Sequence, residues 1–346
     1  MTDASRSNPR DTPPDPAIVL DLLEAFRRSQ TLFAALDLGV FDALQQRPDT
    51  FGRLAERLAA DADALERLLD ACVGLELLAK HDGVYANTPL ATAYLTSTSP
   101  RRMTGYLHYS RDVSWRLWEH LADAVREGTH RWKQVYGWDG PIFSHFFKTE
   151  ESQHEFLMGM HGFGLISSPV VVRCFDLREF QHLVDLGAAT GHLAIAACEA
   201  YPSLRATVFD LPDVLPLARK IVHESSVADR IELVPGDFFK DPLPSGDLYT
   251  LGRIVHDWSE EKILRLLRRI HDHLPAGGAL LIAEKVLLPD KTGPRWAQMQ
   301  NLNMLTCTEG KERTLAEYQA ILTQVGFRDV TCRSTDAPLD AVLARK

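Results

Sequence analysis

The stretch from His182 to Pro212, HLVDLGAATGHLAIAACEAYPSLRATVFDLP, constrains the fold of this chain more than any other. A short apolar run is followed by a turn of small residues, Gly187–Gly191, and then by a compact helical stretch. A second β-rich run, Ala206–Phe209, ends in an acid, Asp210, about twenty residues after the turn. This order predicts a strand, a tight turn, a helix and a second parallel strand, the building unit of a Rossmann-like sheet.

The turn differs from the G-x-G-x-x-G pattern of dinucleotide sites, because only Gly187 and Gly191 are glycines. A diphosphate needs several backbone N–H groups and a helix dipole. A nucleoside with a methionine tail needs only close backbone approach and an acid for its ribose. The motif therefore favours S-adenosylmethionine over a nicotinamide cofactor, with Asp210 at the ribose hydroxyls. A tight turn in an unrelated α/β protein stays open as the alternative.

The alternation of strands and helices continues to the C-terminus. Apolar runs predict strands at 231–234, 247–251, 279–283, 330–334 and 340–344, and helical spacing predicts helices at 214–224, 259–274 and 314–325. Ser259 is the expected N-cap of one helix, and Thr314 with Glu317 forms an expected capping box at another. We expect an α/β, Rossmann-like doubly wound sheet in residues 176–346, with its last pair of strands antiparallel.

Residues 17–100 show a different pattern, in which helices are closed by a hairpin. Apolar spacing predicts helices at 17–38, 40–44 and within 51–78, and Asp82-Gly83 predicts a tight turn between short strands. Such a mostly helical, winged-helix-like pattern suits either DNA binding or dimerisation. The helix 61–75 is acidic and would repel phosphates, so a dimerisation domain is favoured.

Two further regions flank this domain. The leader 1–16 is polar and proline-rich, and we expect it to be disordered. Residues 101–175 are expected to form a helical linker and pocket region, with aromatic residues and methionines gathered in 103–127 and 143–163. Such density more often marks a core than a pocket. Because it precedes a cofactor domain, it could also line a pocket for a flat apolar substrate.

Composition narrows the classes of function. The formal net charge of -9 argues against a nucleic-acid-binding surface. The five cysteines are scattered without a CxxC pair, which suits a reducing compartment and offers neither a disulfide framework nor a zinc site. The sequence has no N-terminal signal pattern and no run of about 18 apolar residues. We therefore expect a cytoplasmic protein that binds neither membrane nor nucleic acid.

Four acids or bases lie at the carboxyl ends of predicted strands: Asp210, Asp237, His256 and Glu284. Ligands of open α/β sheets bind at this edge of the sheet. Beyond Asp210, Asp237 would accept from an adenine amino group, with Phe238 against the ring. The alternative for Asp237 is a carboxylate that caps its own loop. No D-x-D or similar carboxylate cluster accompanies these residues, so we expect no metal site.

His256 is the sharpest single candidate. An imidazole with a pKa near 6.5 suits removal of a proton from a hydroxyl that attacks a methyl group. Such a base needs an orienting carboxylate on its other nitrogen, and Glu284 and Glu312 are candidates. A loop histidine bonded to backbone and, for Glu312, a surface charge paired with a neighbouring cation are the alternatives. On the helix before Glu312, Asn303 could bond a substrate and Met304 could pack on its ring or in the core.

Motifs along nearly the whole chain after residue 17 then carry a family resemblance. They are HLADAVREG (120–128), DLGAATG (185–191), VFDLP (208–212), GDFFKDPLP (236–244), RIVHDW (253–258), LNMLTCTEGKERT (302–314), GFRDV (326–330) and DAVLARK (340–346). In this order they resemble class I S-adenosylmethionine-dependent O-methyltransferases of the plant caffeate and hydroxyindole type.

The resemblance implies a homodimer, formed through the N-terminal domain, whose partner subunit walls part of the active site. It implies His256 as the general base, surrounded by Asp257, Glu284 and Glu312. At the cofactor it implies Gly187, Gly191, Asp210, Leu211, Asp237, Phe238 and Arg253. At the aromatic acceptor it implies Tyr109, Trp118, Phe156, Met160, Asn303, Met304 and Cys307, with Arg253 also facing the substrate.

Two departures from the family pattern matter. The family turn is usually G-G-G-x-G, whereas Ala188 and Ala189 replace two of its glycines here. At Cys307 the animal hydroxyindole enzymes carry a glutamine that grips the substrate, a bond that cysteine cannot make. The expected function is metal-independent transfer of a methyl group to a hydroxyl of a small phenol or hydroxyindole. The alternative is a cofactor-binding relative with no methylation activity or with diverted hydroxylation or decarboxylation chemistry.

Overall fold

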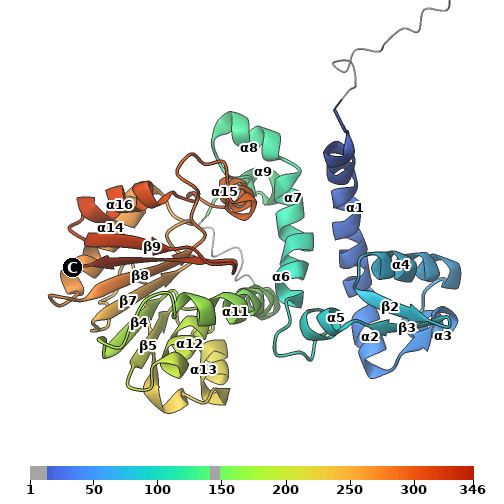
Figure 1. Cartoon of the computed structure of the whole chain (residues 1–346), viewed down its shortest axis with the longest axis horizontal. Coiled ribbons are helices and arrows are strands. Elements are labelled where there is room, and N and C mark those ends of the chain that lie inside the picture. The colour runs from blue at the N-terminus through green and yellow to red at the C-terminus, as the bar shows by residue number, and fades with distance from the viewer. Residues whose placement is uncertain (1–13, 141–148) are drawn as a thin grey trace, which may run out of the picture. The chain divides into compact units, whose positions relative to one another are not determined.

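The computed structural model describes residues 14–140 and 149–346, and the chain divides into two compact units, Met1–Arg102 and Met103–Lys346 (Figure 1). Most of the expected leader 1–16 and residues 143–148 of the expected helical region lie outside the described residues. None of the helices in the described ranges is long and apolar enough to cross a membrane.

The N-terminal unit combines helices with a small antiparallel sheet in the order β1-β3-β2. The helices are α1 Ala17–Asp37, α2 Val40–Gln46, α3 Phe51–Leu58, α4 Ala62–Gly74 and α5 Pro89–Tyr94, and the strands are β1 Asp49–Thr50, β2 Leu78–His81 and β3 Val84–Asn87. Asp82 and Gly83 join β2 to β3 with φ of 50° and 76°, the conformation that an Asp-Gly hairpin turn requires. The Asp61 carboxylate accepts from the backbone N of Ala64 and fixes the start of α4.

The C-terminal unit is built on a seven-stranded sheet in the order β6-β5-β4-β7-β8-β10-β9. Its strands are β4 His182–Leu186, β5 Arg205–Asp210, β6 Ile231–Pro235, β7 Leu248–Gly252, β8 Ala279–Glu284, β9 Arg328–Arg333 and β10 Asp340–Arg345. The strands from β6 to β8 run parallel, whereas β10 is antiparallel to both of its neighbours. The predicted doubly wound sheet and its antiparallel last pair are confirmed.

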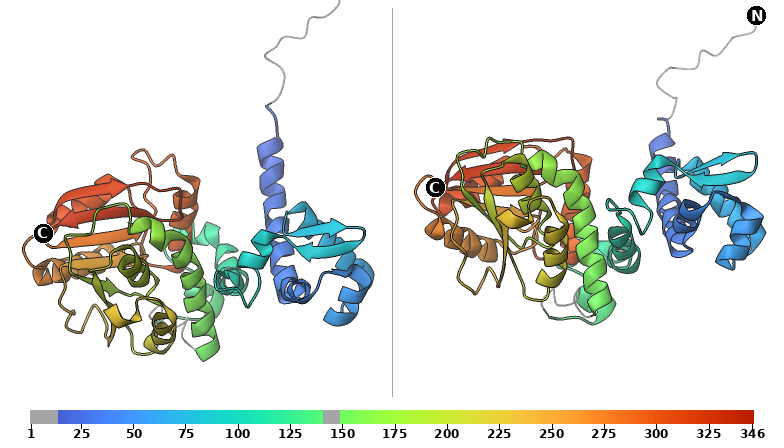
Figure 2. Two further views of the ribbon diagram at one scale, coloured as in Figure 1. Left: turned by 60° about the horizontal axis from the view of Figure 1, so that its bottom comes forward. Right: turned by 90° about the horizontal axis from the view of Figure 1, so that it is seen from below.

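Helices cover both faces of this sheet (Figure 2). They are α12 His192–Ala200, α13 Leu215–Glu224, α14 Glu260–His273 and α16 Leu315–Gln324. A 3-10 turn lies at Ala228–Arg230, and α15 Arg295–Cys307 follows β8. Successive strand residues point to opposite faces: Leu281 packs in the core that α12 and α13 cover, whereas Leu280 and Ile282 pack beneath α14 and α16. This two-sided burial explains why the parallel strands are apolar at nearly every position.

Two helix starts test the predicted caps. Thr314 and Glu317 form the predicted capping box at α16, with both reciprocal hydrogen bonds present. Ser259 occupies the N-cap position of α14, but its side chain makes no capping bond with any described residue. The predicted N-cap position is confirmed without a side-chain bond, and Glu260 and Glu261 in the first turn complement the helix dipole as predicted.

A helical segment precedes the sheet within the same unit. It comprises α6 Thr104–Tyr109, a π-helical turn Ser110–Ser114, α7 Trp115–Trp118, α8 Leu121–Glu127, α9 Trp132–Tyr136 and α11 Glu150–Val171. The helix α11 packs against both α6 and α12, and α15 packs against α7 and α8. These contacts bring the aromatic residues of the segment beside the carboxyl edge of the sheet.

Candidate active site

A cavity of about 410 Å³ lies at the carboxyl edge of the parallel strands. Most of the predicted site residues line it: His256, Asp257, Gly187, Asp210, Leu211, Asp237, Phe238, Arg253, Tyr109, Phe156, Met160, Asn303, Met304 and Cys307. Four predicted site residues are not among those that line the cavity: Gly191, Glu284, Glu312 and Trp118. The structure therefore gathers the predicted residues around one space, and it divides them into those on the wall and those that support it.

The turn after β4 approaches its neighbours so closely that larger residues would collide. Gly187 has a φ of 68°, and a Cβ added there would lie 2.6 Å from the Ile254 side chain. Gly191 has a φ of 77°, and its added Cβ would lie 3.0 Å from Val208. Ala189 also adopts a left-handed backbone with a φ of 51°, although it is not a glycine. Ala188 and Ala189 line the cavity without filling it, so their methyl groups leave room for a ligand.

Asp210 ties this turn to the end of β5. Its two carboxylate oxygens accept from the backbone N of Ala189 and of Leu211, each at 2.7 Å. Burial raises the pKa of Asp210 to about 6, against the opposing effect of these two bonds. The carboxyl group therefore sits at the cavity wall in a fixed orientation, where a ligand hydroxyl could reach it.

Asp237 is engaged in its own loop. One carboxylate oxygen accepts from the backbone N of Phe239 at 2.8 Å, and the other lies 2.9 Å from Nζ of Lys240. These contacts are those of the loop-capping alternative. Asp237 and Phe238 nevertheless line the cavity, so a ligand ring could still contact them.

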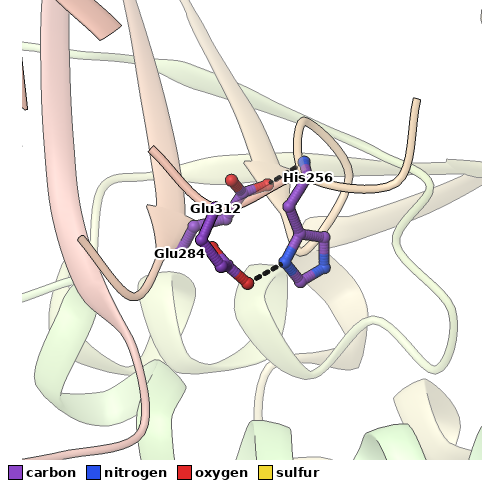
Figure 3. Close-up of side chains that lie close together, drawn as sticks. All are labelled: His256, Glu284 and Glu312. Atoms are coloured by element: carbon purple, nitrogen blue, oxygen red, sulfur yellow. Dashed lines mark hydrogen bonds and ion pairs between the residues drawn. The ribbon is translucent and has the colours of Figure 1, made fainter. Parts of the chain in front are cut away.

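His256 is held by two buried glutamates from distant parts of the chain (Figure 3). Its Nδ1 lies 2.6 Å from Oε1 of Glu312, and its backbone N donates to Oε1 of Glu284 at 3.0 Å. The hydroxyl of Tyr318 donates to the other oxygen of Glu284. Gly310 permits this packing, since an added Cβ there would lie 2.2 Å from the carbonyl oxygen of His256. The imidazole therefore cannot turn without breaking its buried hydrogen bond to Glu312.

The second ring nitrogen of His256 stays on the cavity side. Nδ1 is hydrogen-bonded to Glu312, which does not line the cavity. His256 and Asp257 both line it. Oδ1 of Asp257 lies 3.6 Å from Nε2, which is too long for a strong hydrogen bond. Nε2 is therefore the atom that a ligand hydroxyl would meet.

Charge and burial set the protonation of this cluster. Burial opposes protonation of His256, but the charges of Glu312, Glu284 and Asp257 outweigh it and raise the pKa to about 9. Burial also raises the pKa of Asp257 to about 6, and it raises the pKa of Glu284. The site therefore holds a strong base whose proton is retained at neutral pH.

The same three side chains could be considered as metal ligands. One atom each from His256, Glu284 and Glu312 lies within 4.8 Å of the others. Nδ1 of His256 faces Oε1 of Glu312, and both oxygens of Glu284 accept from protein donors, whereas Oε2 of Glu312 has no hydrogen-bond partner among the described residues. The arrangement therefore orients an imidazole with protein hydrogen bonds, which is the geometry of a general base.

The far side of the cavity is aromatic. Tyr109 and Phe156 meet edge to face with ring centroids 5.7 Å apart. Met304 is almost fully buried in a cluster with Trp132 and Cys307, so it serves the core as well as the wall. The sequence places Trp118 in this wall, whereas the structure places it behind Asn303, because its indole N–H donates to Oδ1 of Asn303 at 2.9 Å.

The residues of the wall that sequence reasoning missed include Asp185, His192 and Tyr106. Asp185 is the acid of the D-L-G motif at the end of β4, and that position alone could have identified it. Its Oδ1 accepts from Thr250 at 2.7 Å, whereas Oδ2 is buried with no described hydrogen-bond partner, and burial raises its pKa to about 7. This orphaned oxygen fits a ligand that brings a donor, as the amino group of S-adenosylmethionine would.

Comparisons with known proteins agree with this site. The model of the O-methyltransferase domain matches residues 118–328, and that of the O-methyltransferase dimerisation domain matches residues 20–97. Acetylserotonin O-methyltransferase of Bos taurus is 40% identical over 338 residues, covering 95% of this chain and 97% of that protein.

Solved structures give the same answer. The crystal structure of human N-acetylserotonin methyltransferase in complex with SAM matches with a TM-score of 0.91 at 39% identity, covering 97% of this chain and 99% of that one. PigF with SAH matches with a TM-score of 0.86 at 28% identity, covering 96% of this chain and 100% of that one. None of these findings favours a relative without methyl transfer. The chain therefore belongs to the O-methyltransferase family, and it is an S-adenosylmethionine-dependent O-methyltransferase.

Proposed function

We propose that the methyl acceptor is a hydroxyl of a small aromatic molecule, a phenol or a hydroxyindole, and that His256 is the general base. The observation that carries the proposal is the imidazole itself. Its Nδ1 is held at 2.6 Å by buried Glu312, and this leaves Nε2 for a hydroxyl in the cavity. Relatives named acetylserotonin O-methyltransferase, with 40% identity, support a hydroxyindole.

The pKa of His256 suits this role. A phenol has a pKa of about 10, so it is a weak nucleophile until its proton leaves. The pKa of His256, about 9, is close to that of a phenol, so proton transfer from the phenol to neutral His256 costs little free energy. The charge of Glu312 stabilises the imidazolium that forms, and Glu284 keeps the backbone of His256 in place. No step requires a metal ion.

The cofactor end is the turn after β4. When bound, S-adenosylmethionine supplies an electrophilic methyl group. We propose that Gly187 and Gly191 allow the backbone to approach it, that Asp210 and Leu211 hold its ribose, and that Asp237 and Phe238 contact its adenine. The orphaned oxygen of Asp185 would take its amino group. Arg253 lines the cavity beside Asp257 and would contact the cofactor or the acceptor.

The acceptor would lie between His256 and the aromatic wall. Tyr109, Phe156 and Met160 offer flat and flexible apolar contacts, and Asn303 offers a polar one. Cys307 lines the same region. Its thiol donates to the backbone oxygen of Asn303 at 2.9 Å, so it offers a ligand sulfur and not an amide. The acceptor would therefore be held mainly through its ring.

We further propose a homodimer formed through the N-terminal unit. The helix α1 exposes Ile18, Leu22 and Phe26 to between 51% and 72%, although such side chains are normally buried. An apolar helix face of this kind within a dimerisation domain fits a second copy of the chain. The five free thiols suit a cytoplasmic location, and the acidic start of α4 argues against nucleic acid.

One experiment tests the acceptor class. The protein is incubated with S-adenosylmethionine and a library of phenols, hydroxyindoles, thiols and amines of similar size, and the products are identified by mass spectrometry. We expect a mass gain of one methylene unit on aromatic hydroxyls. Methylation confined to thiols or amines would contradict the proposal. Cofactor binding measured by calorimetry without any methylated product would favour the alternative of diverted chemistry.

A further inference from the structure

The side-chain amide of Asn303 has its orientation fixed by Trp118. The indole Nε1–H of Trp118, on α7, donates to Oδ1 of Asn303, on α15, at 2.9 Å. An indole nitrogen can only donate, so the atom that faces it must be the amide oxygen. Asn303 lines the cavity and Trp118 lies behind it. The NH₂ group is therefore the end of this amide that a ligand can use.

The neighbouring residues of α15 offer no second donor. The thiol of Cys307 donates to the backbone oxygen of Asn303 at 2.9 Å, and the hydroxyl of Thr306 donates to the same oxygen at 2.9 Å. Both hydrogens are thus used inside the helix. At Met304 and Cys307 the wall presents thioether and thiol sulfur, which are weak acceptors. The amide NH₂ is the strong donor that α15 presents there.

A π-helical turn makes the contact between Trp118 and Asn303 possible. Tyr109 ends α6 and Trp118 ends α7, with the π turn Ser110–Ser114 between them. In an unbroken α-helix, residues at this spacing would point to opposite sides, because each residue turns by about 100°. A π turn contains about one more residue than an α-helical turn, so it reduces the rotation between Tyr109 and Trp118 by about one residue's share. Tyr109 can therefore face the cavity while Trp118 reaches α15.

From this geometry we propose that Trp118 is a specificity-determining positioning residue, which makes the enzyme prefer aromatic hydroxyl acceptors carrying a hydrogen-bond acceptor, such as a carbonyl, away from the methylated hydroxyl. The inference rests on the proposed function. An acceptor with a carbonyl satisfies the NH₂ of Asn303. An acceptor with a hydrocarbon tail leaves that donor unpaired in a largely apolar site, which weakens its binding.

The test compares two hydroxyindole substrates that differ only in this tail, a methyl ketone and its isosteric isopropenyl analogue. For the wild-type enzyme we expect kcat/KM to favour the ketone by about five- to tenfold, mainly through KM. In Trp118→Phe the aromatic ring remains but the N–H is lost, so the amide can turn. We expect the preference to fall below about twofold, mainly through a change in KM.

Two further variants separate positioning from packing. Trp132 also donates its indole N–H to α15, but to the backbone oxygen of Cys307 at 2.7 Å. Trp132→Phe therefore removes a comparable bond and should keep the ketone preference. Asn303→Asp keeps an oxygen for Trp118 but has no N–H for the ligand, so it should abolish the preference even if Trp118→Phe folds poorly.

The outcomes are distinct. Equal use of both compounds by the wild-type enzyme would overturn the donor assignment, while methylation of both would leave the proposed function standing. A preference that survives in Trp118→Phe, or that is lost equally in Trp132→Phe, would overturn the role of Trp118. Methylation of neither compound by a protein that binds S-adenosylmethionine would refute a hydroxyindole acceptor and this inference with it.

Discussion

The loops after β4 and β7 build two sides of one cavity in opposite ways. These strands are parallel neighbours in the sheet, so their carboxyl ends lie side by side. The loop after β4 presents backbone and small residues, held by the nearby Asp210. The loop after β7 presents the imidazole of His256, held by residues 28 and 56 positions further along the chain. A cofactor shared by a family can be bound by local backbone, whereas a proton must be moved by a side chain whose support comes from elsewhere in the fold.

The largest effect should come from the β7 side, because the base has no substitute there. Replacing His256 by Ala should lower kcat/KM for an aromatic hydroxyl by about 10²–10⁴-fold, the usual worth of a general base. Cofactor affinity measured by calorimetry should change by less than about twofold, since the β4 turn is untouched. His271→Ala is the matched control, because His271 packs on Phe327 outside the cavity lining. Normal turnover in His256→Ala would remove His256 from the mechanism.

The next effect tests the support of that base. Glu312→Gln keeps the shape but removes the charge at 2.6 Å from Nδ1, and kcat should fall by about a hundredfold. The active form of His256 is unprotonated, so wild-type kcat/KM should rise with pH up to its pKa of about 9. Loss of the negative charge lowers this pKa, and the midpoint of the pH profile should move down. An unchanged midpoint in Glu312→Gln would mean that another group controls the profile.

A smaller effect belongs to the β4 side. Asp210→Asn keeps a side chain of equal size but loses the charge-assisted hydrogen bonds that a carboxylate accepts from hydroxyls. We expect S-adenosylmethionine to bind about tenfold more weakly by calorimetry, with kcat at saturation little changed. The exposed Asp229 offers a control, and Asp229→Asn should leave the affinity unchanged. Equal affinity of Asp210→Asn and wild type would show that the ribose is held elsewhere.

A still smaller effect concerns the backbone of the turn. Ala189 has a φ of 51°, which a glycine adopts without strain, so Ala189→Gly should raise the free energy of unfolding by up to about 1 kcal/mol. Ala188 has no positive φ, and Ala188→Gly should gain nothing. Urea unfolding of the two variants measures the difference. Equal stabilities would mean that the surrounding structure, and not the backbone conformation, sets the cost.

Removal of metal ions is expected to have no effect on turnover. Treatment with EDTA followed by gel filtration should leave turnover within about twofold, because the side chains around His256 are held by protein hydrogen bonds. If activity were lost and Mg²⁺ or Zn²⁺ restored it, this result would instead identify the cluster of His256, Glu284 and Glu312 as a metal site. The β4 side would then bind the cofactor and the β7 side would bind a metal ion.

The same contrast explains how much could be predicted from the sequence. The strands, the turn and Asp210 follow from local patterns, since their partners lie within about one β-α-β unit. His256 and its glutamates could be proposed as candidates, but their contacts depend on how β7, β8 and the loop before α16 pack together. The position of Trp118 could not be predicted, because it depends on a π turn that has no pattern in the sequence.

The placement of β10 has a consequence for how the protein is made. This final strand lies between β8 and β9, and Ala341–Ala344 are buried there. While the chain is still emerging from the ribosome, β9 has no strand to pair with and the edge of β8 stays open. The N-terminal unit can fold during synthesis, whereas the sheet of the catalytic unit is complete only after β10 has been made and inserted between β8 and β9. Truncated products of this chain would thus carry a complete dimerisation domain and an unfinished sheet.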